Sequence, residues 1–226
     1  MKQINQKNPY VLKIINDLKI PTLAQIGALE SFIKTSSNKL SEEENNLILL
    51  TLNSCTHMEN LIEIYSTLEN LNRNTSQLNY EKFDIVKLVN ERFSKENIII
   101  KYKKLELSLN SQSAILLNAD KFLIKKAIDN IINCCLEKAF SETNIAICLK
   151  EEKNNIHFKI SYKGIAPNFE TNQKAYKKQN LTKLFEEQDY DIGLHLANKI
   201  ILAHFGIMLF QEHAQNENLI CFKMPV

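Results

Sequence analysis

The chain has 226 residues, a mass of 26.1 kDa and a net charge of +2, with 44% hydrophobic and 24% charged residues. This composition is ordinary for a globular protein and excludes wholesale disorder. Arg73 and Arg92 are its only arginines, so the guanidinium forks of a dedicated nucleic-acid binder are nearly absent. No apolar run approaches the roughly 18–20 residues that span a bilayer, and no signal-peptide pattern opens the chain. We therefore expect a cytoplasmic protein that binds no nucleic acid and enters no membrane.

The cysteines and glycines limit the possible sites. There are five cysteines, an odd number, and none has CxxC spacing, so we expect reduced core thiols and no metal site. There are only four glycines. Loops that wrap phosphates need glycine where the backbone approaches the ligand, so any nucleotide site here would be poor in that residue.

The first 72 residues are predicted to form two long helices. Asn8-Pro9 is a plausible start, and Pro21 should kink the first helix. Ser41 followed by Glu44 is a capping box that opens the second helix. In this second helix, residues recur at the three- and four-residue steps of a heptad seam. They are Leu47, Leu50, Ser54, Met58, Leu61, Tyr65 and Leu68.

A short turn over residues 35–40 predicts that the two helices are antiparallel neighbours. Because two helices alone cannot bury both of their apolar stripes, we expect a homodimer with a four-helix bundle. The polar break from Arg73 to Gln77 marks a linker, which gives a helical hairpin over 1–74 and a second domain over 75–226.

The second domain alternates strand and helix patterns. Asp120 is predicted to cap its longest helix. The predicted strands are 77–84, 105–109, 114–118, 145–150, 156–162, 207–213 and 219–224, and the predicted helices are 85–95, 120–140 and 192–205. The fold class is therefore α+β, a helical hairpin followed by an α/β sandwich whose mixed, mostly antiparallel sheet has helices on one face.

Six segments resemble the boxes of sensor histidine kinases, in the order of that family. The run Asn-Asp-Leu-Lys-Ile-Pro-Thr at 16–22 is similar to the H box, while 52–61 and 77–84 look like the second helix and the linker. The N box, the F box and the G2 box with its trailing helix are resembled by 130–135, 184–186 and 193–206. The resemblance covers nearly the whole chain. It implies a dimerisation and histidine-phosphotransfer hairpin followed by a Bergerat-type ATPase domain.

The chain departs from this family at the phosphoacceptor. The histidine position is Asn16, whose amide lone pair is delocalised and is no useful nucleophile. Asp17, the acid that orients the histidine in the family, is retained. Ile20 stands where kinases that also dephosphorylate their partner have a water-positioning Thr or Asn. The resemblance therefore implies neither autophosphorylation nor phosphatase activity here.

The nucleotide boxes depart as well. In the N box Asn130 is retained, but Cys134 replaces the asparagine that supplies an oxygen to Mg²⁺. The G1-like stretch 160–167 has no acid for the adenine amino group. It offers Ser161 and Gly164. The G2-like stretch keeps only Gly193 and adds Asp191 where phosphate would sit. We expect a vestigial site at Asn130, Cys134, Ser161, Gly164 and Gly193, with no bound cofactor unless it still holds ATP and Mg²⁺.

The leading hypothesis is a degenerate histidine kinase that acts by binding. In the family, receiver domains of response regulators dock below the phosphoacceptor, so the partner would be a receiver domain or an active kinase. The corresponding residues are Leu18, Pro21, Thr22, Leu23, Leu61 and Ile62.

Two alternatives remain open. One is an active kinase or phosphotransferase that uses a displaced phosphoacceptor, for which His57 is the other histidine of the hairpin. The second is a domain that senses a nucleotide without turnover. Residues 174–183, rich in lysine, stand where the family has its ATP lid, and Tyr162 and His195 are candidates to fill the adenine pocket.

Overall fold

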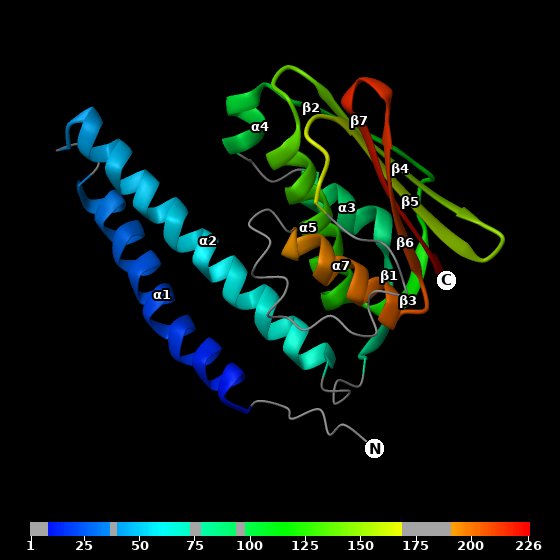
Figure 1. The fold of residues 1–226 in the computed structure, drawn as a ribbon, viewed down its shortest axis with the longest axis horizontal. Helices are drawn as coiled ribbons and strands as arrows, with labels where there is room; N and C mark the ends of the chain where they lie inside the picture. Colours follow the sequence, from blue (N-terminus) through cyan, green and yellow to red (C-terminus); the bar gives the residue numbers. More distant parts are fainter. Residues whose placement is uncertain (1–8, 37–39, 73–77, 94–97, 169–190) are drawn as a thin grey trace. The chain divides into compact units, whose positions relative to one another are not determined.

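The computed structural model describes residues 9–36, 40–72, 78–93, 98–168 and 191–226. The chain divides into two compact units, Met1–Ser76 and Gln77–Val226, whose elements are drawn in Figure 1. The predicted linker at 73–77, the F-box-like residues 184–186 and the stretch 174–183 lie outside the described residues. In the described part of the chain, no helix combines the length and hydropathy needed to traverse a lipid bilayer.

The first unit is the predicted helical hairpin, made of α1 (Pro9–Ser36) and α2 (Glu42–Asn72). The helix α1 runs without interruption through Pro21. The capping box is confirmed at the start of α2, because the Ser41 amide donates to Glu44 Oε2 at 2.8 Å and the Glu44 amide donates to Ser41 Oγ at 3.3 Å. These two bonds satisfy N–H groups that the first helical turn leaves without partners.

One seam of the hairpin is buried and another is exposed. Ile15 and Thr22 on α1 are buried seven residues apart, as are Cys55 and Ile62 on α2, and Cys55 Sγ lies 3.8 Å from Gln25 Oε1 across the hairpin. The first half of the predicted α2 seam lies on the exposed side instead. Among the described residues, eight large apolar side chains of the two helices are between 42% and 65% exposed: Ile14, Leu18, Leu23, Phe32, Leu47, Leu49, Leu50 and Met58.

The second unit contains two sheets where the sequence predicted one. Strands β1 (Tyr80–Asp84) and β3 (Leu116–Asp120) form an antiparallel pair of their own. The five-stranded sheet has the order β2-β4-β5-β7-β6, with β2 parallel to β4 and the other neighbours antiparallel. Its strands are β2 (Glu106–Ser111), β4 (Asn144–Glu152), β5 (Asn155–Lys163), β6 (Ile207–His213) and β7 (Glu217–Pro225).

Helices cover one face of the five-stranded sheet, as predicted, and this face holds the core of the unit (Figure 1). The main ones are α5 (Lys121–Lys138) and α7 (Ile192–Ala203), which pack side by side. Asp120 caps α5 as predicted, because its Oδ1 accepts the Leu123 amide at 3.0 Å. The α+β fold class predicted from the sequence is confirmed.

Two predicted elements have shifted boundaries for physical reasons, and one helix was not predicted. The predicted strand 114–118 begins and ends two residues later, since β3 pairs with β1 from Asp84↔Leu116 to Tyr80↔Asp120. The helix predicted to reach 140 ends at Lys138, because Ala139 is extended and bridges to the sheet. The short helix α4 (Ile98–Lys103) was not predicted, since its β-branched opening run disfavours helix. The helix α3 (Ile85–Phe93) agrees with the prediction as far as the described residues extend.

Lys103 anchors the C-terminal end of α5. Its Nζ donates to the carbonyl oxygens of Leu136, Glu137 and Ala139 at 3.1, 2.5 and 2.8 Å. Those carbonyls have no partner within the helix, and the negative end of the helix dipole favours a cation there. The last turn of α5 is therefore fixed by a side chain from α4.

We predict that Lys103→Met lowers the free energy of unfolding by about 1–3 kcal/mol, because the carbonyls lose a charged donor. Lys104→Met is the matched control. Lys104 makes only an exposed ion pair to Glu142, with side chains 74% and 70% exposed, so its loss should change stability by less than about 0.5 kcal/mol. Urea titrations of both variants measure the difference, and equal losses would contradict the role given to Lys103.

Candidate functional site

The residues at the phosphoacceptor-equivalent position are exposed on α1. Asn16 and Asp17 both have exposed side chains. The neighbouring Thr22 is buried, and its Oγ1 donates to the carbonyl of Leu18 at 2.8 Å, one turn earlier. Asn16 therefore presents a carboxamide to solvent, where a partner can reach it.

The predicted docking residues fall into two groups. Leu18, Pro21 and Leu23 are exposed and Leu61 is half-buried. Ile62, like Thr22, is buried within the first unit. Four of the six predicted positions therefore offer a side chain to a partner.

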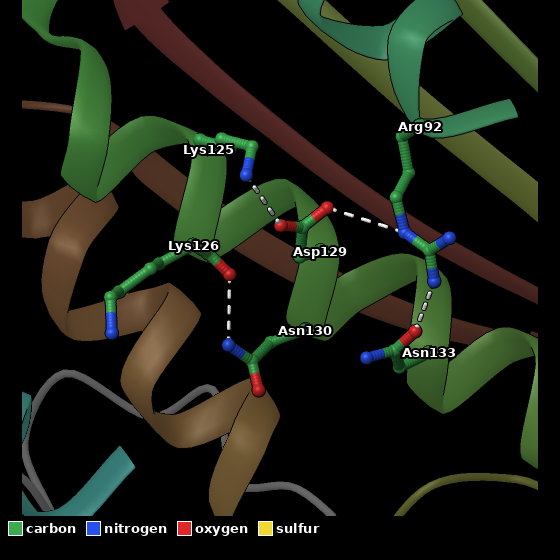
Figure 2. A network of polar contacts seen from close by, with 6 residues as sticks. All are labelled: Arg92, Lys125, Lys126, Asp129, Asn130 and Asn133. Carbon is green, nitrogen blue, oxygen red and sulfur yellow. Dashed lines mark hydrogen bonds and ion pairs between the residues drawn. The ribbon is translucent and has the colours of Figure 1, made fainter. Parts of the chain in front are cut away.

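Three residues of the candidate nucleotide site lie on one face of α5. Asn130, Cys134 and Lys138 are four residues apart, which places them in one row along the helix. The Asn130 Nδ2 donates to the Lys126 carbonyl at 2.8 Å, and its oxygen lies beside α7 (Figure 2). An ideal Cβ built at Gly193 on α7 would be 2.7 Å from that oxygen. The row therefore faces the N-terminus of α7, as the resemblance implied for an N box and a G2 box.

Asp191, at the start of α7, is bound by groups of its own chain. Its Oδ2 lies 3.4 Å from Lys138 Nζ and accepts the Asn168 amide at 2.9 Å, while Cys134 Sγ lies 3.8 Å from its Oδ1. It makes no side-chain capping bond to α7. The side chains of the Lys138–Asp191 pair are 22% and 17% exposed. We call Cys134, Lys138, Asn168 and Asp191 the Asp191 cluster.

Burial dominates the electrostatics of the Asp191 cluster. It raises the pKa of Asp191, a rise that the Lys138 ammonium opposes. It also raises the pKa of the Cys134 thiol, and the Asp191 carboxylate adds to that rise. The pKa of Cys135 is raised by the same two causes in the same order. Both thiols are therefore protonated at neutral pH, and neither is a nucleophile or a metal ligand in that form.

Tyr162 lies near the C-terminal end of strand β5, close to the Asp191 cluster. The residue is 3% exposed, and its hydroxyl donates to the Ile165 carbonyl at 3.0 Å. Burial raises its pKa, and Cys135, Cys134 and Asp191 add to the rise. Ser161, which the sequence suggested as the residual adenine contact, is exposed on the opposite face of the strand. The strand thus turns a bulky phenol toward the helices and turns the small hydroxyl away.

Gly164 joins the sheet to the end of α5. The Ile165 amide donates to the Lys138 carbonyl at 3.0 Å, and the Phe140 amide donates to the Lys163 carbonyl at 2.9 Å. A Cβ at Gly164 would lie 2.1 Å from the Lys138 carbonyl oxygen, so only glycine permits this approach. Here the glycine serves a contact between two backbones, not contact with a ligand.

A separate polar network fixes the other side of α5 to α3. Arg92 Nε lies 3.3 Å from Asp129 Oδ1, and its Nη2 donates to Asn133 Oδ1 at 2.5 Å. Lys125 Nζ lies 3.9 Å from Asp129 Oδ2, as Figure 2 shows. Because Arg92 engages Asn133, that asparagine does not substitute for Cys134. The network orients the helix that carries the row Asn130, Cys134 and Lys138.

The structure therefore places Gly193 against Asn130, with Cys134 one turn further along the same helix face. Gly164 lies instead against the backbone of Lys138 at the end of α5, and Ser161 faces away. Sequence reasoning missed Lys138 and Asn168. The four-residue spacing from Cys134 to Lys138 was a usable signal for the first. Among the described residues, no group of three or more His, Cys, Asp or Glu side chains could hold a metal ion.

We predict that Gly164→Ala lowers the free energy of unfolding by at least about 2 kcal/mol, because the new methyl group meets backbone that cannot move aside. Gly193→Ala is the matched comparison. Its methyl group would meet the Asn130 side chain, which can rotate, so the loss should be smaller. Chemical denaturation measures both. A larger loss at Gly193 would mean that Asn130 is fixed more firmly than the β5–α5 junction.

No protein-family model matches the chain, and no curated protein sequence matches it. The chain does match solved structures, at low sequence identity. The histidine kinase AdeS of Acinetobacter baumannii is 17% identical, over 90% of this chain and 94% of that one, with a TM-score of 0.61. The catalytic domain of the histidine kinase ThkA is 17% identical, over 65% of this chain and 97% of its own, with a TM-score of 0.53. Full-length ShkA, solved with AMPPNP, is 14% identical over 96% of this chain, with a TM-score of 0.66, and this chain spans 45% of its length. The chain therefore has the fold of a histidine kinase core.

Proposed function

We propose that this protein is a degenerate sensor histidine kinase core of a two-component system, which binds a signalling partner and does not transfer phosphate from ATP. The fold shared with histidine kinases supports the two-component role. The loss of catalysis is supported by the chemistry of the Asp191 cluster and of Asn16.

The observation that carries the proposal is the bonding of Asp191. Its carboxylate takes up the Lys138 ammonium and the Asn168 amide at the start of α7, where a kinase would hold the phosphates of ATP. A nucleotide phosphate would have to displace this buried carboxylate and would be repelled by it at short range. The protonated Cys134 thiol beside it is also a poor ligand for Mg²⁺, which prefers oxygen. ATP and Mg²⁺ therefore do not fit these residues.

The second loss is the nucleophile. The exposed Asn16 has no lone pair suited to attack a γ-phosphate, so even a bound nucleotide would meet no acceptor at this position. His57, the histidine considered as a displaced acceptor, is exposed on α2. No interaction described in the structure gives His57 an orienting acid.

What remains is a surface for binding. The residues that follow Asn16 and Asp17 on α1 include three with exposed apolar side chains, Leu18, Pro21 and Leu23. In kinases of this family, receiver domains dock on this segment. The exposed seam of the hairpin, with Leu47, Leu50 and Met58, favours a homodimer in which a second hairpin covers it. Such a dimer could sequester a response regulator, or one of its chains could pair with an active kinase.

The catalytic part is tested with labelled ATP and Mg²⁺. We expect no acid-labile label on the wild type, and none on Asn16→His, because restoring the nucleophile leaves the Asp191 cluster in place. ATP should also leave the melting temperature unchanged, whereas a ligand at 100 times its Kd would stabilise by about 2.7 kcal/mol. Label on Asn16→His would show a working nucleotide site. Label on the wild type that disappears in His57→Ala would show a displaced acceptor.

The binding part is tested with purified receiver domains and histidine kinases of the source organism, by titration calorimetry. We expect one of them to bind, and Leu18→Glu to weaken binding at least about tenfold, or 1.4 kcal/mol, by placing a charge in the apolar contact. Leu49→Glu is the matched control, since Leu49 is 46% exposed but lies on α2, outside the predicted docking residues. Binding by none of these proteins, or equal weakening by both variants, would contradict the proposal.

A further inference from the structure

The buried residue Asp120 makes the hydrogen bonds that fix the start of the second unit. Asp120 Oδ2 accepts the Asn79 amide at 3.0 Å, just before β1, and its Oδ1 accepts the Leu123 amide at 3.0 Å in the first turn of α5. The Asp120 amide itself donates to Nε2 of His204 at 3.1 Å. Asp120 and His204 are 8% and 2% exposed. One residue therefore ties the segment that enters β1 to both α5 and the end of α7.

The hydrogen bonds define the protonation state of His204. Its Nδ1 lies 2.8 Å from the Ile200 carbonyl, which can only accept, so Nδ1 carries the proton. Its Nε2 faces the Asp120 amide, which can only donate, so Nε2 is unprotonated. The ring is therefore neutral, and its single acceptor is committed to the backbone of Asp120.

The groups around the ring make protonation disruptive. A proton on Nε2 would place two donors face to face at 3.1 Å and leave a charge in a nearly solvent-free position. The charged group that faces His204 is the Asp120 carboxylate, between β3 and α5, which would be drawn from the Asn79 and Leu123 amides toward the new cation. From β1, the Tyr80 ring packs edge-on against His204, with centroids 5.8 Å apart. Movement of the imidazole would therefore disturb contacts to α5, to the end of α7 and to β1.

We propose that His204 is an acid-sensitive latch, whose unprotonated Nε2 holds the Asp120 amide and whose protonation releases the entry to β1 and the first turn of α5. The latch needs neither a partner nor a nucleotide, so it goes beyond the proposed function. Through the Asn79 amide, it acts on the residue that precedes β1, the first strand of the second unit.

The pH range follows from linkage. Burial lowers the pKa of His204 below its ordinary value of 6.5, against smaller opposing contributions from the Ile200 carbonyl and Asp120. A base with a lowered folded-state pKa stabilises the fold above its unfolded pKa, and this stability is lost as pH falls through the folded pKa. The latch is therefore closed at pH 7 and opens below 6.5. His195, also on α7, has its pKa lowered to about 4 by burial, so it stays largely neutral at pH 5.

Amide hydrogen exchange on the full chain tests the latch. Protection factors, corrected for intrinsic exchange, should fall at least about tenfold between pH 7 and pH 5 at Asn79, Asp120 and Leu123, because the open state binds a proton that the closed state excludes. Exchange in the central strand β5 should not change. Long-range ¹H–¹⁵N spectra at pH 7 should show Nδ1 protonated and Nε2 bare.

Two variants distinguish the loss of the acceptor atom at position 204 from the loss of titration there. His204→Gln keeps an acceptor oxygen near the Nε2 position but does not titrate, so its three amides should stay protected at both pH values. His204→Phe keeps a ring but offers no acceptor, so the three amides should be poorly protected at both pH values. Constant protection in the wild type, or the same fall with pH in His204→Gln, would overturn the proposal. If His204→Phe does not fold, the comparison of wild type with His204→Gln still decides.

Discussion

The bond between the Asp191 carboxylate and the Lys138 ammonium is the constraint on which the candidate site depends. It links the start of α7 to the end of the α5 face that carries Asn130 and Cys134. The pair is mostly shielded from water, so it is screened little by salt, and removing one partner would leave an uncompensated charge. A negative group at a helix N-terminus is favourable in itself, and here the chain supplies that group from its own sequence.

Most of the core of the second unit lies outside the candidate site, although Cys134 belongs to both. The helix-facing side of the sheet is lined by Ile145, Ile147, Phe158 and Ile160, and α5 presents fully buried isoleucines to it. These contacts depend on apolar area and shape, which substitutions at the helix termini do not alter. The architecture therefore does not depend on which residues stand at position 16 or at the start of α7.

Local signals in the sequence predicted the parts of this structure that depend on neighbours in the chain. The Ser41–Glu44 capping box and the Asp120 cap were readable because a helix start requires partners for its own amides. The position of Asp191 was readable from the family pattern, and helical spacing put Lys138 on the same face as Cys134. The pairing of Lys138 with Asp191 was not readable, since it requires α7 to meet α5 in three dimensions. The placement of Ser161 in the site was avoidable. Strict alternation in β5 places Ile160 and Tyr162 on the buried face and Ser161 on the other.

Under the proposed function, the hairpin and the second unit depart from a working kinase in different ways, and this difference bears on function. Asn16 is a change of one exposed side chain, which leaves the surrounding surface of Leu18, Pro21 and Leu23 intact. The Asp191 cluster is a set of mutual bonds, so it holds together as a structural element in its own right. A surface that keeps its apolar groups while its reactive atom is replaced is suited to binding, because docking depends on desolvated contacts and not on the nucleophile. Under the proposed function, the exposed residues of α1 carry the binding, and the Asp191 cluster serves the structure of the second unit.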